Sequence, residues 1–97
     1  MLDTLTRTVR LHPSDNVIVC VDMIPAGTAV EHVTATERIM RGHKMATLAI
    51  AKGEPVTKFG QIIGFASRDI PAGAHVHEHN CSMGEFERDY AFAQGNS

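Results

Sequence analysis

A seven-residue pattern, I-x-x-G-x-x-V, occurs three times in this 97-residue chain, at residues 24–30, 50–56 and 70–76. The isoleucine of each copy is expected to anchor in a core, and the glycine to adopt a positive φ that a β-carbon resists. The valine then begins the next strand. Because the copies are unequally spaced, they do not form a solenoid. The pattern predicts one turn design that is reused within a small β domain.

Two segments before the first copy have the patterns of β-strands. In residues 5–11, L-T-R-T-V-R-L, the apolar side chains stand at alternate positions with Arg7 among them, which is typical of a half-exposed strand. Residues 16–21, N-V-I-V-C-V, contain a continuous apolar run rich in β-branched side chains, which predicts a strand covered on both faces. The stretch H-P-S-D-N between these segments is typical of a turn.

The segment 34–42, T-A-T-E-R-I-M-R-G, is compatible with a short helix. Thr34 or Thr36 could act as the N-cap, and Gly42 as the stop. Residues 33–36 fit a strand equally well, so the sequence leaves both interpretations open.

The expected architecture is a mainly β fold, in a single small domain with short helical turns. We place the domain at residues 1–92 and a flexible C-terminal tail at residues 93–97. Phe86, Tyr90 and Phe92 give the end of the domain three aromatic side chains in a polar segment. Such anchors suggest docking onto this domain or onto a partner.

Composition excludes several classes of partner. The net charge is -2 and the pI is near 6.3, which argues against nucleic acid and anionic membranes, since phosphate surfaces select basic proteins. No apolar run approaches the ~20 residues of a membrane span, and the N-terminus has no pattern of a secretory signal. Cys20 and Cys81 are isolated, which favours free thiols in a reducing cytoplasm.

The stretch H-V-H-E-H-N, residues 75–80, is the strongest candidate for chemistry. On a strand, alternate side chains share one face, so His75, His77 and His79 would point the same way. Two such imidazoles can share a Zn²⁺ or Fe²⁺ ion, with His43 as a third ligand from elsewhere in the chain. Solvated histidines without a role, or histidines that hydrogen-bond a polyol or carboxylate, fit the same spacing.

Lys44 and Lys58 are cations that each lie two residues from a glycine, and each could hold a carboxylate. A solvated lysine is the alternative for both. The sequence contains no G-x-S-x-G, C-x-x-C, Walker loop or G-x-G-x-x-G motif, so it offers no support for a nucleophile elbow or a nucleotide site.

The combined motifs of residues 42–80 closely resemble the N-terminal domain of the altronate and galactarate dehydratase family. The family pattern reads roughly G-H-K, I-x-x-G-x-x-V, K-Y-G-x-x-I-G and D-I-x-x-G-x-H-V-H-x-H-N, and the resemblance extends over about residues 8–92. It implies an SAF-type β-clip fold. Phe59 stands where the family usually has tyrosine, so any role of that hydroxyl is lost here.

The resemblance also implies an activity. The family enzymes remove water from sugar acids to give 2-keto-3-deoxy acids, with a divalent metal, commonly Fe²⁺ or Mn²⁺. Carried onto this chain, the resemblance implies that His77 and His79 are metal ligands. It implies catalytic roles for His43, Lys44 and Asn80. It also implies that His75 and Lys58 bind the substrate.

Full-length dehydratases of this family carry a large C-terminal domain that this chain lacks. The resemblance therefore implies a small subunit that acts with a separate large subunit on a sugar-acid substrate, and that could also self-associate. The small subunit of a sulfolactate sulfo-lyase, which eliminates sulfite, is an alternative. A non-catalytic β-clip module that binds carbohydrate or a partner protein is another.

Overall fold

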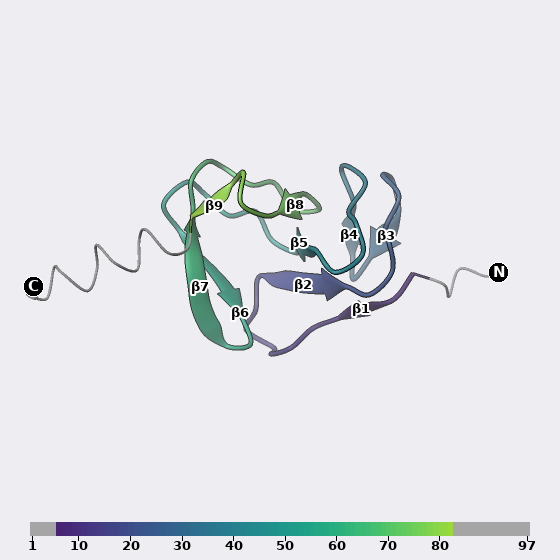
Figure 1. Cartoon of the computed structure of the whole chain (residues 1–97), viewed down its shortest axis with the longest axis horizontal. Helices are drawn as coiled ribbons and strands as arrows, with labels where there is room; N and C mark the ends of the chain where they lie inside the picture. Colours follow the sequence, from purple (N-terminus) through teal and green to yellow (C-terminus); the bar gives the residue numbers. More distant parts are fainter. Residues whose placement is uncertain (1–5, 83–97) are drawn as a thin grey trace, which may run out of the picture.

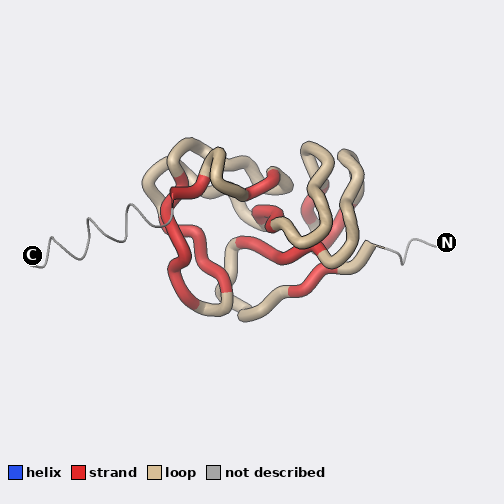
Figure 2. Tube along the Cα trace, viewed as in Figure 1, coloured by secondary structure: helices blue, strands red, loops and turns tan. Residues whose placement is uncertain are grey.

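The computed structural model describes residues 6–82 and forms nine short β-strands within them (Figure 1). No helix occurs in this range, where Figure 2 shows strands and loops alone, so no helix there could cross a membrane. The mainly β class is confirmed, whereas the expected short helical turns are wrong. The strands are β1 (Thr8–Val9), β2 (Val17–Cys20), β3 (Ala29–Val30), β4 (Val33–Thr34), β5 (Lys44–Ala46), β6 (Pro55–Lys58), β7 (Gln61–Ala66), β8 (His75–Val76) and β9 (Cys81–Ser82).

The strands form three antiparallel sheets. A four-stranded sheet has the order β1-β2-β5-β8, a three-stranded sheet has the order β6-β7-β9, and β3 pairs with β4. In Figure 1 the β6–β7 and β3–β4 hairpins lie at opposite ends of the described domain, with β2 and β5 between them. This small all-strand domain is consistent with the SAF-type β-clip fold that the resemblance implies.

The predicted buried strand is confirmed at β2, where Val17, Ile18 and Cys20 are at most 1% exposed. The first strand is shorter than residues 5–11, because β1 pairs with β2 through Thr8 and Val9 alone. The expected tail at 93–97, the domain end at residue 92 and the three aromatic anchors lie outside the described residues.

Two hydrophobic cores lie on the two sides of β5. Met45 belongs to one core and Ala46 to the other, as the alternation of side chains along a strand requires. The first core contains Val17, Ala46, Ile50, Val56, Ala66, Ile70, Ala74, Val76 and Cys81. The second core contains Ile18, Cys20, Ile24, Ala35, Ile39 and Met45.

The repeated turn is built as the sequence predicts. The isoleucine of each copy is at most 2% exposed, and the glycines have φ of 89° to 91°. In each copy the N–H after the glycine bonds the carbonyl three residues earlier, at 2.9–3.2 Å, which makes a type II turn. Ile50 and Ile70 also pair with each other through backbone bonds of 2.8 and 2.7 Å.

A fourth copy of this turn replaces the expected helix at 34–42. Ile39 pairs with Ile24 through two backbone bonds of 2.8 Å, as Ile50 pairs with Ile70. Gly42 has φ of 85°, and His43 N–H bonds the Met40 carbonyl at 3.0 Å. The helix interpretation is wrong because these long-range backbone bonds satisfy the segment in an extended form. The sequence pattern missed this copy because Met45 stands in the place of the valine.

The tip of the β6–β7 hairpin is held by a buried carboxylate. Asp15 is 3% exposed, and its two oxygens accept the N–H groups of Phe59 and Gly60, each at 2.8 Å. Both tip residues have positive φ, 62° and 73°, and Phe59 adopts this conformation against the preference of its side chain. Burial acts to raise the pKa of Asp15, but the hydrogen bonds from Gly60 and Phe59 leave it below its ordinary value.

We predict that Gly73→Ala destabilises the domain more than Gly27→Ala. Both glycines have φ near 90°, so either β-carbon costs about 1–2 kcal/mol of backbone strain. A β-carbon at Gly73 would also overlap the carbonyl oxygen of Thr34, whereas none at Gly27 meets an atom within 4 Å. Urea unfolding should show a loss of about 3 kcal/mol or more for Gly73→Ala. Equal losses for the two variants would contradict this account of the turn.

We predict that the stabilising effect of Asp15 depends on pH. Because its pKa is lower in the folded state, its contribution is present above the unfolded pKa of about 3.9 and is lost as pH falls through the folded value. Asp15→Asn retains one acceptor oxygen, so it should lower the free energy of unfolding by about 1–2 kcal/mol at pH 7. The difference from the wild type should shrink towards pH 3 in denaturant titrations. Glu78→Gln, at an exposed carboxylate, is the control and should show no such trend.

Candidate functional site

The candidate site lies where the copies of the turn at residues 39–45 and 70–76 lead into β5 and β8. His43 is the last residue of one turn and directly precedes β5, and His75 begins β8. The two strands are antiparallel, with Met45 opposite His75 and Lys44 opposite Val76. Continuing this register would place His43 opposite His77. The topology therefore brings His43 next to His75 and His77, which lie more than 30 positions later in the sequence.

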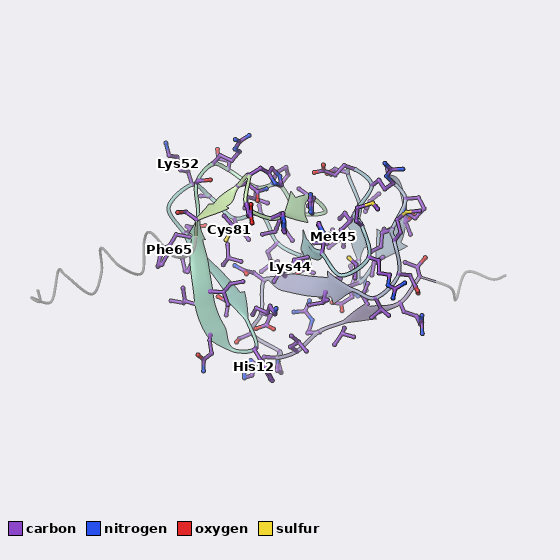
Figure 3. The ribbon with its side chains drawn as sticks, in the orientation of Figure 1. His12, Lys44, Met45, Lys52, Phe65 and Cys81 are labelled. Carbon is purple, nitrogen blue, oxygen red and sulfur yellow. The ribbon has the colours of Figure 1, made fainter. Side chains whose placement is uncertain are left out.

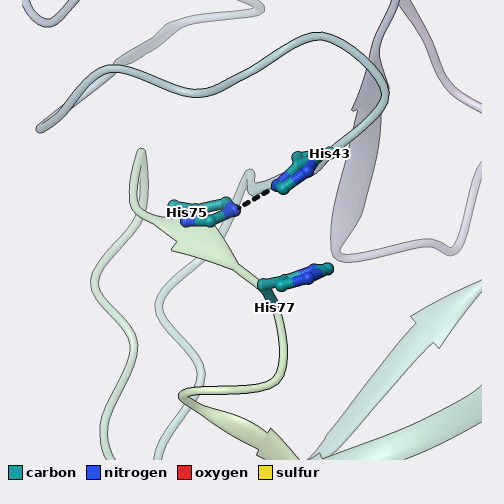
Figure 4. Close-up of side chains that lie close together, drawn as sticks. All are labelled: His43, His75 and His77. Carbon is teal, nitrogen blue, oxygen red and sulfur yellow. Dashed lines mark hydrogen bonds between the residues drawn. The ribbon is translucent and has the colours of Figure 1, made fainter.

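Three imidazoles meet at this point (Figure 4). His43 Nδ1 lies 2.8 Å from His75 Nε2, which is a hydrogen bond between the rings. His77 stacks on His43 with ring centroids 4.5 Å apart and an interplanar angle of 20°. One nitrogen from each of the three rings lies within 4.8 Å of the other two. All three side chains are half-buried, so each retains a solvent-facing side.

The expectation of one strand that carries three alternating histidines is wrong. β8 ends at Val76, and residues 77–80 form a turn in which the N–H groups of Asn80 and Cys81 bond the His77 carbonyl at 3.1 and 2.9 Å. His79 is exposed and lies outside the group of three, with its ring tilted 34° to that of His75 at 5.1 Å. His43, which the sequence placed in the site as a third ligand, is brought into the group.

Asn80 closes the histidine turn through both ends of its side-chain amide. It is 5% exposed, its Oδ1 accepts the His77 N–H at 3.0 Å, and its Nδ2 donates to the His75 carbonyl at 2.8 Å. The amide therefore fixes the backbone on both sides of Val76. Asparagine side chains often hydrogen-bond nearby backbone groups in turns, so an asparagine at this position is a local sequence signal of a turn.

The surroundings of His75 lower its pKa and so favour its neutral form. Burial lowers its pKa, as do His43, His79 and His77, while Glu37 acts in the opposite direction. Glu37 also accepts the His75 N–H through Oε2 at 3.2 Å. A neutral imidazole keeps one nitrogen lone pair, which a metal ion or a donor group can use. The sequence pattern around Glu37 is that of a possible helix and gives no sign of its contact with His75.

Lys44 and His43 are neighbours in sequence but face different sides of β5. His43 lies beside His75, whereas Lys44 shares the face of Ala46, which belongs to the first core. Burial lowers the pKa of Lys44, Lys58 lowers it further, and Cys81 opposes both. The structure thus separates the expected site residues into an imidazole group and a lysine group.

Both cysteines are buried free thiols, as the sequence predicts. Burial raises the pKa of Cys20 to about 11. Burial also raises the pKa of Cys81, while Lys44 acts to lower it. Figure 3 labels Lys44 near the middle of the described domain and Cys81 towards its β6–β7 end. Neither thiol belongs to the group of three candidate ligands.

Comparisons with known proteins agree on one family. The model of the altronate/galactarate dehydratase SAF domain matches residues 6–84. Altronate dehydratase of Escherichia coli is 45% identical over 76 residues, which are 74% of this chain and 15% of that protein. Galactarate dehydratase (L-threo-forming) of the same organism is 34% identical over 73 residues, which are 72% of this chain and 14% of that protein.

A subunit of a different lyase also matches. The (2R)-sulfolactate sulfo-lyase subunit alpha of Paracoccus pantotrophus is 43% identical over 49 residues, which are 50% of this chain and 73% of that protein. This chain thus spans about 15% of the length of the curated dehydratases and most of the length of this small subunit.

We predict that Asn80→Ala destabilises the histidine turn. The change leaves the buried His77 N–H and His75 carbonyl without their partner, which should cost about 2 kcal/mol or more in the free energy of unfolding. Amide hydrogen exchange at His77 should accelerate accordingly. Asn80→Asp keeps the acceptor and loses the donor, so its loss should be intermediate. Wild-type protection of His77 in Asn80→Ala would contradict the role of the amide.

Proposed function

This chain belongs to the altronate/galactarate dehydratase SAF domain family, and from that membership we propose that it is the small subunit of a metal-dependent sugar-acid dehydratase. The reaction eliminates water β to a carboxylate and gives a 2-keto-3-deoxy acid. The observation that carries the proposal is the group of three imidazoles, assembled from two turns of a chain whose relatives are named dehydratases.

We propose Fe²⁺ or Mn²⁺ as the cofactor, with His43, His75 and His77 as its ligands. The donor set fits such an ion, because imidazole nitrogens that share one ion at about 2.1 Å lie about 3.0–3.4 Å apart. The 2.8 Å between His43 Nδ1 and His75 Nε2 is already near that spacing. When bound, a divalent ion supplies Lewis-acid stabilisation of the charge that develops on the substrate carboxylate.

Our proposal differs from the roles that the resemblance implied, including the one for His79 as a metal ligand. His43 and His75, expected as a catalytic and a substrate-binding residue, become ligands in our proposal, and His77 remains one. His79 is exposed beside His75, where it can hydrogen-bond a substrate hydroxyl or exchange a proton with it. Asn80 acts as a positioning residue, because its amide is occupied by the backbone of the histidine turn.

A large subunit on a separate chain is the proposed partner. The matched segment is 15% of the altronate dehydratase, so most of that enzyme has no counterpart in this chain. Three half-buried imidazoles offer metal ligands, and in our proposal a second chain supplies the rest of the substrate site. We place this assembly in the cytoplasm, where the two free thiols stay reduced.

A sulfo-lyase is the second candidate. The chain covers 73% of the sulfo-lyase subunit alpha, whose name marks it as one part of a complex. Sulfite elimination also requires that the negative charge developing on the substrate carboxylate be stabilised, so the imidazole group suits both reactions. The two candidates differ in the leaving group and are separated by the product.

We predict that the isolated chain with Fe²⁺ or Mn²⁺ does not dehydrate altronate or galactarate, and that adding the large subunit gives turnover. His75→Ala/His77→Ala should then lower kcat by more than about 100-fold and remove bound metal, since even residues that support metal ligands are worth about 10- to 100-fold. His32→Asn is the matched control, because His32 is exposed, has φ of 69° and lies outside the group.

Three outcomes would decide between the candidates. Robust turnover by the isolated chain would overturn the split-subunit proposal. Release of sulfite from sulfolactate, without dehydration of sugar acids, would select the sulfo-lyase. Full activity and unchanged metal content in the double variant would leave the chain as a non-catalytic carbohydrate- or partner-binding module.

A further inference from the structure

Two lysines from different sheets face the same core. Lys44 lies opposite Val76 in the β5–β8 ladder, and directly opposed residues point to the same side of a sheet. Lys58 is two residues after Val56 on β6, and the register shift at this point leaves its extra residue, Ile63, in β7, so Val56 and Lys58 still share a face of β6. Val56 and Val76 both belong to the first core. The stems of both lysines therefore run along the edge of that core.

Within residues 6–82, neither of these two ammonium groups belongs to an ion pair. Lys58 lies near enough to act on the charge of Lys44, and the other group that acts on it is the buried thiol of Cys81. The ion pairs within residues 6–82 join Arg7 to Asp22 and Arg10 to Glu31, and neither lysine takes part. Both side chains are half-buried. Two partly desolvated like charges are unfavourable alone, and a bound anion would offset that cost.

A surface pocket adjoins Lys58. It has a volume of about 400 Å³ and is lined by Lys58, Phe59, Gln61 and Ile63. The ring of Phe59 is held there by a backbone conformation that Asp15 fixes through the hairpin tip. The pocket thus offers a cation, an amide and apolar walls, which suits a small polar molecule with one charged end.

We propose that Lys44 and Lys58 form a carboxylate-binding subsite for the sugar acid, separate from the imidazole group. The subsite lies on the face of β5 opposite to His43 and needs no metal ion. The hydroxylated carbon chain of the ligand extends into the adjoining pocket, where Gln61 can hydrogen-bond it. The choice of a sugar acid rests on the proposed function, whereas the preference for a carboxylate rests on the lysine pair itself.

The test is an NMR titration of the full chain with galactarate in the presence of a chelator. Galactitol, which has the same carbon chain without carboxylates, is the ligand control. Galactarate should shift the backbone amide signals of Lys44 and Lys58 and of the pocket residues, and galactitol should not. Lys44→Met and Lys58→Met should each weaken binding about tenfold or more. Lys52→Met is the matched control at an exposed lysine and should bind as the wild type does.

A second measurement separates binding from folding. Lys44→Met removes a half-buried cation without an ion-pair partner in the described domain, so its thermal midpoint should equal or exceed that of the wild type. A lower midpoint together with unchanged galactarate binding would overturn the subsite. Shifts confined to His43, His75 and His77, or no shifts at all, would also overturn it. Shifts of equal size with galactitol would show hydroxyl recognition and have the same consequence.

Failure of the subsite and failure of the proposed function are distinguishable. If galactarate binds through the lysines but the complex with the large subunit dehydrates no sugar acid, the subsite stands and the function fails. If the complex turns over and both lysine variants keep the wild-type KM, the function stands and the subsite fails.

Discussion

Four type II turns, each anchored by a buried isoleucine, are the constraint on which this domain depends. The turn glycines have φ of 85° to 91°, and each donates its N–H at 2.7–2.8 Å to a carbonyl of a distant segment. The isoleucines pair in twos, Ile24 with Ile39 and Ile50 with Ile70, through backbone bonds that tie one turn to another. Strands of two to six residues form few hydrogen bonds with their neighbours, so pairing between strands alone stabilises this domain little. These paired turns provide the long-range connections that the short strands cannot.

The same turns position the candidate site. His43 is the closing residue of one turn, and His75 follows the closing residue of another, so both rings inherit their places from backbone that the cores already fix. Asn80 then holds His77 relative to His75 through the backbone. The imidazoles approach each other because of hydrogen bonds made elsewhere in the chain. A site assembled this way does not need a separate hydrophobic core of its own, which suits a domain of this size.

The sequence predicts what depends on local chemistry and misses what depends on distant partners. The three visible turn copies and the burial of Cys20 follow from composition and from the conformational demands of glycine. The fourth copy was hidden because Met45 replaces the valine and because a threonine, a glutamate and a glycine imitate the ends of a helix. The bond between Ile39 and Ile24, which decides the matter, leaves no local trace in the sequence. For the histidines, the alternation of side chains along a strand does not extend beyond Val76, because β8 ends there in the turn that Asn80 closes.

The alternation of β5 then has a consequence for electrostatics. His43 and Lys44 are adjacent in sequence, yet one contributes to the imidazole group and the other lies over the first core. Two unit charges about 5 Å apart repel by about 3 kcal/mol at an effective dielectric constant near 20, and a divalent ion would double that repulsion. With both lysines next to the imidazoles, cation binding there would be strongly opposed. Separation by one strand allows the same small domain to present imidazole nitrogens on one face of β5 and positive charge on the other. In our proposals, the β5 register therefore keeps the metal site and the carboxylate subsite from opposing each other electrostatically.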